Sequence, residues 1–192
     1  MELAGKTIGV AMSGSFCTYE NAFQELQKLV EAGAKVQTIF SEAAQTIDSR
    51  FGKAEEFVRR AEILTGRTPM LTIAEAEPIG PKSLLDLLIV FAMYRKYDCK
   101  TCKWITDTPV LMAAKAHLRS EKPLLLSIST NDALGMNMKN IGLLLNAKHV
   151  YFVPFGQDNP EKKPNSMIAH TELLREAAEA ALDGKQYQPI LQ

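Results

Sequence analysis

Short apolar runs of strand length alternate along the chain with segments whose apolar residues recur at helical spacing. The strand-like runs span 7–12, 35–40, 85–92, 123–128 and 149–153. The helix-like segments span 19–33, 54–64, 109–119, 139–146 and 170–182. Strands that alternate with helices usually run parallel, with the helices packed on the sheet. The pattern therefore predicts an α/β protein with a mostly parallel sheet and helices on both faces.

Local signals support several of these boundaries. Thr108 is a good N-cap, and Pro109 suits the first position of the helix that follows. Gly33 comes where a glycine C-cap would end the first helix. The segment 75–82 contains two prolines and a glycine, which predicts a loop. The polar stretch 154–167 contains three prolines and predicts a second, longer loop before the last helix.

Composition limits the class of protein. The chain has 192 residues, so we expect residues 1–192 to form a single domain. Its 22 basic and 22 acidic residues cancel, which gives no global field for nucleic acid or an acidic membrane. The apolar run 84–93 is about half as long as a bilayer span, and the N-terminus is a poor signal peptide. We expect a cytoplasmic protein.

Ligands of parallel sheets bind where strands end, so the segments after the strands are the candidate sites. Ser13, Gly14 and Ser15 follow the first strand and precede the first helix, where backbone amides can hold a phosphate. The same three residues would also suit a purely structural turn. Ser41, after the second strand, offers a further hydroxyl to a ligand or caps a helix.

Two later segments offer polar groups. Ser129, Thr130, Asn131 and Asp132 follow the 123–128 strand and suit either ligand binding or a capped turn. The 154–167 segment offers its anion-binding groups from Lys162, Lys163, Asn165 and Ser166. Its other interpretation is a solvated surface segment or an oligomer contact.

Histidine and cysteine suggest little further chemistry. The three histidines, His117, His149 and His170, show no nucleophile–base arrangement along the sequence. Cys99 and Cys102 form a C-x-x-C pair, which can indicate redox chemistry or half of a metal site. Because no second pair lies at metal-finger spacing, we predict no metal site and interpret the pair as free thiols.

Longer motifs carry a resemblance to a known family. They are SGSFCTYE (13–20), AEPIGPK (76–82), TDTPVLMAAKA (106–116), STNDALG (129–135) and YFVPFGQDNPEKKPNSM (151–167). Together they resemble the B subunits of dipicolinate synthases, which belong to a flavoprotein superfamily with flavin prenyltransferases and cysteine decarboxylases. The resemblance covers the whole chain except 93–103.

The resemblance implies a Rossmann-like three-layer αβα sandwich, usually assembled into homo-oligomers. It implies a partner A subunit that binds NAD(P), and a complex that oxidises a dihydrodipicolinate-type precursor to dipicolinate in the mother cell of sporulating bacteria. FMN is the implied cofactor, with its phosphate at Ser13, Gly14 and Ser15. A later superfamily loop of the P-x-M-N type corresponds to Ser129, Thr130 and Asn131. For the dicarboxylate substrate we predict Lys162, Lys163 and Asn165.

Two departures from the family matter. The decarboxylase relatives use a histidine in the N-terminal half, whereas this chain has none before His117, which argues against decarboxylation. From Ala92 onward the family reads A-P-C-T-G-N-T-I-A-K-L-A-N-G-I-T-D-T-P-V, whereas this chain reads A-M-Y-R-K-Y-D-C-K-T-C-K-W-I-T-D-T-P-V. Loss of two bases after the Ala92 codon and of one base before Ile105 converts the first reading into the second. A compensated frameshift, in the gene or in its reading, therefore explains 93–103.

These observations favour an oxidoreductase subunit with a superfamily phosphate site and no identified catalytic residue of its own. Two alternatives stay open at this point. One is a stand-alone FMN enzyme of the prenyltransferase or decarboxylase type. The other is a non-catalytic scaffold for the A subunit.

Overall fold

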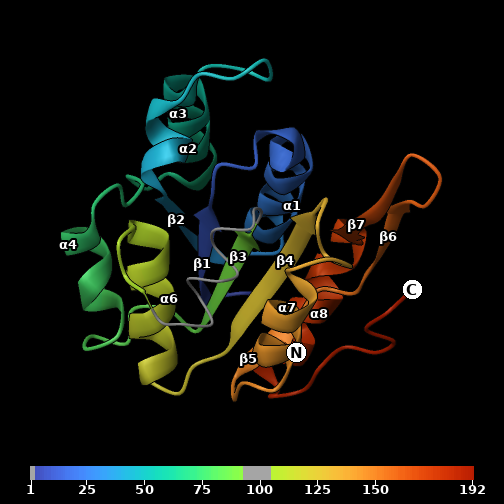
Figure 1. Ribbon diagram of the computed structural model, residues 1–192. Coiled ribbons are helices and arrows are strands. Elements are labelled where there is room, and N and C mark those ends of the chain that lie inside the picture. The colour runs from blue at the N-terminus through green and yellow to red at the C-terminus, as the bar shows by residue number, and fades with distance from the viewer. Residues whose placement is uncertain (1–2, 93–104) are drawn as a thin grey trace.

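The computed structural model describes residues 3–92 and 105–192, which form a sheet with helices on both faces (Figure 1). The strands are β1 (Thr7–Met12), β2 (Lys35–Phe40), β3 (Leu87–Ala92), β4 (Leu124–Thr130), β5 (Val150–Phe152), β6 (Phe155–Asn159) and β7 (Lys163–Ala169). The α-helices are α1 (Tyr19–Glu31), α2 (Glu42–Thr46), α3 (Ala54–Thr65), α4 (Ile73–Ala76), α6 (Pro109–Arg119), α7 (Met138–Leu145) and α8 (Leu174–Leu182). Short 3₁₀ turns are η1 (Phe16–Thr18), η2 (Glu77–Ile79) and η3 (Thr171–Leu173).

The sheet is mostly parallel, as the sequence predicts. Its strand order is β2-β1-β3-β4-β7-β6, and β5 pairs with β4 as well. Strands β1 to β5 pair in parallel, whereas β7 runs antiparallel to both β4 and β6. The first half of β4 contacts β5 and its end contacts β7, so one strand joins the parallel sheet to an antiparallel hairpin.

Helices cover both faces of the sheet. Helices α1 and α8 contact one another on one face, and α6 with α4 lies on the other (Figure 1). Strand β3 is central and carries only apolar residues, Leu87 to Ala92, as expected for a strand covered on both sides. This arrangement confirms the predicted three-layer α/β architecture.

The segment 75–82 is not the loop that its prolines predict. Helix α4 begins at Ile73, because Thr72 and Glu75 form a capping box in which each side chain accepts from the other's backbone amide. The backbone amides of Leu71 and Thr72 lower the pKa of Glu75, because they stabilise its carboxylate. Pro78 then occupies the first turn of η2, where its missing N–H costs nothing.

The segment 154–167 is also not a loop. It forms the β6–β7 hairpin, whose register pairs Phe155 with Ala169 and Gly156 with Ile168. Asn159 makes the turn by accepting a 2.9 Å hydrogen bond from the amide of Lys162. The strands were missed because only their base is buried, so the apolar alternation of a half-buried strand never develops.

Strand β4 is longer than predicted, and this changes the position of two candidate residues. Ser129 and Thr130 belong to the strand, paired with Ile168 and Met167 of β7, rather than to the loop that follows. Among the described residues, none of the helices is both long and apolar enough to cross a bilayer.

Candidate functional site

The ends of β1, β3 and β4 meet at one edge of the sheet, and this edge holds most of the predicted site residues. Met12 pairs with Phe91 in β3, and Phe91 pairs with Ser127 in β4. The segments after β1 and β4 therefore lie at the same edge, which confirms their predicted arrangement. Their role in binding stays a prediction.

Ser13 ties two strands together. It is buried, and its hydroxyl donates a 2.8 Å hydrogen bond to the backbone carbonyl of Phe91. Its own carbonyl accepts a 2.5 Å hydrogen bond from the hydroxyl of Tyr19, whose ring lies edge-on against Phe57 with centroids 4.8 Å apart. Because its hydroxyl proton is used internally, the Ser13 side chain cannot also donate to a ligand.

The turn after Ser13 presents backbone donors. Among the described residues, no hydrogen bond uses the amide N–H groups of Gly14, Ser15 or Phe16. Thr18 returns to Ser15, donating its hydroxyl to the carbonyl at 2.9 Å and lying 3.2 Å from the Ser15 hydroxyl. A run of amides at the start of a helix suits an anion such as a phosphate.

Ser41 serves as a helix cap. Its hydroxyl accepts a 3.3 Å hydrogen bond from the amide of Ala44 at the start of α2, and the residue is fully buried. Helix α2 also limits the space at Gly14, because a Cβ on Gly14 would lie 3.3 Å from the Cβ of Ala43. Of the two interpretations of Ser41, the structure therefore favours the cap.

A small hollow opens beside this turn, between α1 and the strand ends. About 10 Å³ of it is accessible to the centre of a water molecule, which is room for one water. Hydroxyl and amide side chains alternate with apolar ones around it, from Thr18, Asn21, Phe91, Ser127, Ile128, Ser129, Ile168, Ala169 and Thr171. Ser129 thus lies at the hollow, close to the predicted phosphate turn.

Thr130 and Asn131, which were predicted to bind a ligand together with Ser129, do not line the hollow. Thr130 is buried, and its hydroxyl accepts a 3.3 Å hydrogen bond from the amide of Asp132. Asn131 is exposed in the turn that follows β4. Ser129 lines the hollow, Thr130 holds a turn, and Asn131 faces solvent.

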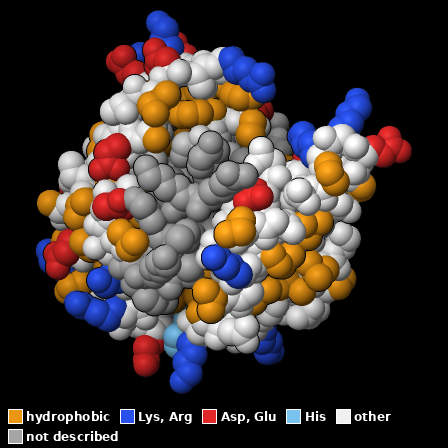
Figure 2. Space-filling model, in the orientation of Figure 1, with side chains coloured by type: hydrophobic (Ala, Val, Ile, Leu, Met, Phe, Trp, Pro, Cys, Tyr) orange, Lys and Arg blue, Asp and Glu red, His pale blue; other side chains and the backbone are white. Residues whose placement is uncertain are grey.

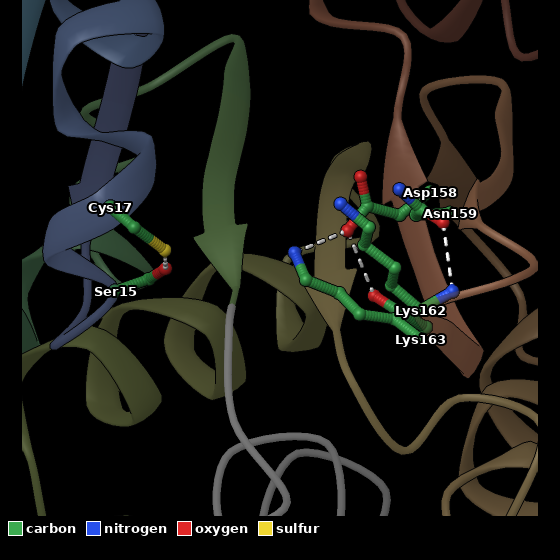
Figure 3. A network of polar contacts seen from close by, with 7 residues as sticks. Ser15, Cys17, Asp158, Asn159, Lys162 and Lys163 are labelled. Atoms are coloured by element: carbon green, nitrogen blue, oxygen red, sulfur yellow. Dashed lines mark hydrogen bonds and ion pairs between the residues drawn. The ribbon is translucent and has the colours of Figure 1, made fainter.

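The β6–β7 hairpin projects past the end of β4 and carries the predicted substrate lysines (Figure 1). Lys163 forms a 2.8 Å ion pair with Asp158, and this carboxylate raises the pKa of the lysine. Figure 3 shows the ammonium of Lys163 on the side of the hairpin that faces Ser15 and Cys17. Lys162 and Asn165 are exposed, and the backbone carbonyl of Asn165 accepts from the amide of Leu134 at 3.1 Å.

One histidine, His117, lies far from this edge of the sheet. His117 is buried in α6, with Nε2 2.9 Å from the carbonyl of Pro123, at the edge of the sheet opposite the candidate site. Burial lowers the pKa of His117 to about 4, so the ring is neutral at physiological pH. The predicted C-x-x-C pair and the whole of 93–103 lie outside the described residues.

Several residues at this edge were not found from the sequence. Asp158 and Asn159 organise the hairpin, and Thr18 and Asn21 line the hollow. The Asn159-Pro160 dipeptide is a turn signal that could have revealed the hairpin. Nothing in the sequence marks Asn21, because an asparagine on a helix usually faces solvent.

The described residues fit one part of FMN only. The amides of Gly14, Ser15 and Phe16 suit its phosphate group. Among the described residues, the hollow beside them is far smaller than the roughly 300 Å³ at which ligand pockets begin, so these residues by themselves do not enclose a flavin ring.

Known proteins with similar sequences and folds agree with this architecture. The chain is 45% identical over 189 residues, 98% of its length, to the B subunit of dipicolinate synthase from Bacillus subtilis (strain 168), of which it covers 94%. No family model matches it. The crystal structure of the corresponding B subunit from Bacillus halodurans superposes with a TM-score of 0.91 at 45% identity, covering 100% of this chain and 98% of that one.

A more distant neighbour shares the fold alone. The FMN-dependent cysteine decarboxylase SpaF superposes with a TM-score of 0.67 at 16% identity, covering 95% of this chain and 98% of its own. The Rossmann-like flavoprotein fold expected from the sequence motifs is therefore confirmed.

Proposed function

Because the chain belongs to the family of dipicolinate synthase B subunits, we propose that it acts in a two-component oxidoreductase of sporulating bacteria. Its partner is an A subunit that binds NAD(P). Together they oxidise a dihydrodipicolinate-type precursor to dipicolinate: the precursor gives a hydride to NAD(P)⁺ on the A subunit and a proton to solvent. The identity of 45% over 98% of the chain is the observation that carries this proposal.

This chain's own part is to bind and orient the dicarboxylate. Lys163, with Lys162 beside it, lies on the side of the hairpin that faces Ser15 across the end of β3 (Figure 3). Charge-assisted hydrogen bonds from lysine and from backbone amides are the natural partners of two carboxylates. The turn that contains Ser15 would hold the phosphate if FMN binds.

An exposed apolar surface supports assembly with another chain. Large hydrophobic side chains gather over α7 and the turn before it (Figure 2). They are Leu134, Met136, Met138, Leu143 and Leu145, which are 41–70% exposed. Apolar clusters of this kind are typical of contacts between protein chains.

Reconstitution tests the proposal. The purified chain is mixed with the A subunit of a dipicolinate synthase, and NAD(P)H formation and dipicolinate are measured. We expect activity from the mixture and from neither protein alone, and a visible spectrum reports any flavin. A yellow protein that is active without its partner would establish a stand-alone FMN enzyme instead. A colourless chain that activates the A subunit, even when Lys162 and Lys163 are replaced, would establish a scaffold.

A further inference from the structure

The Asp158 carboxylate accepts hydrogen bonds from two donors within the β6–β7 hairpin. Its Oδ2 atom accepts a 2.8 Å hydrogen bond from the ammonium of Lys163 and a 3.3 Å hydrogen bond from the hydroxyl of Ser166. Ser166 is 5% exposed, whereas the Lys163 side chain is 58% exposed. One donor is therefore anchored in the fold and the other is open to solvent.

The turn of the hairpin builds this geometry. Asn159 accepts from the amide of Lys162 at 2.9 Å, which returns the chain so that Lys163 lies beside Asp158 (Figure 3). Gln157 donates its side-chain amide to the carbonyl of Pro164 at 2.8 Å and holds the two strands together just before the turn closes. The donors are therefore placed before any ligand arrives.

An ammonium and a hydroxyl that converge on one carboxylate oxygen form a carboxylate-binding pair. Here the protein's own carboxylate fills that pair. A ligand carboxylate that reaches Lys163 must displace Asp158, and it regains the same two hydrogen bonds. The binding free energy that such a ligand gains at Lys163 is therefore smaller than it would gain from a lysine without an ion-pair partner.

We propose that Asp158 is a specificity-determining residue that competes with the ligand's carboxylate for Lys163 and Ser166. The inference rests on the proposed function, since it assumes that a dicarboxylate binds at this edge. A ligand with one carboxylate uses it on the amides of Gly14 and Ser15 and has none left for the exchange. A dicarboxylate uses one carboxylate on these amides and the other on Lys163 and Ser166. Asp158 therefore affects the affinity for dicarboxylates and not the affinity for ligands with one carboxylate.

The test is binding of pyridine-2,6-dicarboxylate to the full chain, alone and with the A subunit, by calorimetry at low ionic strength. Asp158→Asn removes the competing charge and should tighten binding by about threefold, the size expected for release of one exposed ion pair. Affinity for pyridine-2-carboxylate, which has one carboxylate, should not change. In a Lys163→Met background the gain from Asp158→Asn should vanish.

Glu161→Gln is the matched control, because Glu161 lies exposed at the same turn and takes no part in the donor pair. It should leave the affinity unchanged. Equal tightening by Glu161→Gln and Asp158→Asn would mean a general charge effect and overturn the proposal. Unchanged or weaker binding by Asp158→Asn would do the same. Asp158→Ser serves as a second variant if Asp158→Asn lowers the unfolding temperature.

The same measurement distinguishes failure of the substrate assignment from failure of the competitor role. If the wild-type chain binds no dicarboxylate either alone or in the complex, the proposed substrate assignment fails. If the wild type binds and the Asp158 variants show no gain, the assignment stands and the competitor role is rejected.

Discussion

The hydroxyl of Ser13 donates to the carbonyl of Phe91 across 2.8 Å, and this bond joins the end of β1 to the end of β3. The two residues are 78 positions apart in the sequence. Together they hold the turn that presents the amides of Gly14 and Ser15.

Replacing Ser13 with Ala should destabilise the protein by about 1–2 kcal/mol, because the buried carbonyl of Phe91 loses its donor. Urea unfolding measures the change in free energy. Thr46→Ala, which removes an exposed hydroxyl on α2, is the control and should cost less than about 0.5 kcal/mol. Equal effects from both would show that the Ser13 bond contributes nothing.

Gly14→Val should abolish binding of inorganic phosphate at the turn after β1. A Cβ at Gly14 would already lie 3.3 Å from the Cβ of Ala43, so a branched side chain would crowd the turn whose amides we propose to hold the anion. Gly142→Val is the control, because a Cβ at Gly142 meets nothing within 4 Å. Titration of each variant with phosphate decides, and unchanged affinity for Gly14→Val would refute the anion site.

Replacing Lys162 and Lys163 together with Ala should raise the apparent KM of the reconstituted complex for its substrate. The physical reason is the loss of two cations that we propose to bind the ligand's carboxylates. Steady-state kinetics gives KM, and gel filtration with the A subunit gives assembly. A variant that assembles more weakly with the A subunit, but whose assembled complex keeps the wild-type KM, would make the hairpin an interface.

Stability should fall as the pH drops below about 6.5, because of His117. Its folded pKa is about 4 and its ordinary value is 6.5, so between these values the unfolded chain binds a proton that the folded protein does not. The free energy of unfolding that the neutral His117 ring contributes is fully present above pH 6.5. About 2 kcal/mol of it is lost at pH 5. Urea unfolding at pH 7 and pH 5 measures it.

His117→Gln keeps a donor near the carbonyl of Pro123 and does not titrate in this range. The variant should therefore lose less stability between pH 7 and pH 5 than the wild type. The same slope in both proteins would assign the pH dependence to other groups.

Peptide sequencing by mass spectrometry across 92–105 should decide the frameshift hypothesis. A peptide that contains Tyr94-Arg95-Lys96-Tyr97 places the double shift in the gene itself. A peptide with the family's T-G-N-T instead places the shift in the reading of the gene. The intact mass is an independent check, because the two versions differ in length by one residue.

The sequence alone determined the five parallel strands, the longer helices and the edge at which the polar turns meet. Apolar periodicity carries that information, because a covered strand such as Leu87–Ala92 and an amphipathic helix such as Tyr19–Glu31 must each present apolar side chains to the core. The N-cap Thr108 and the proline Pro109 determine the start of α6 through contacts with residues only a few positions away. Local chemistry could therefore predict them.

The tertiary structure alone decided the β6–β7 hairpin, the extra length of β4 and the internal partners of the site. The hairpin is solvated over most of its length, so burial leaves no pattern in its sequence, and only pairing with Ser129 and Thr130 makes it part of the sheet. Asp158 becomes the partner of Lys163 because the turn at Asn159 folds one strand back on the other. Contacts of this kind depend on where distant backbone segments meet, which residue spacing does not encode.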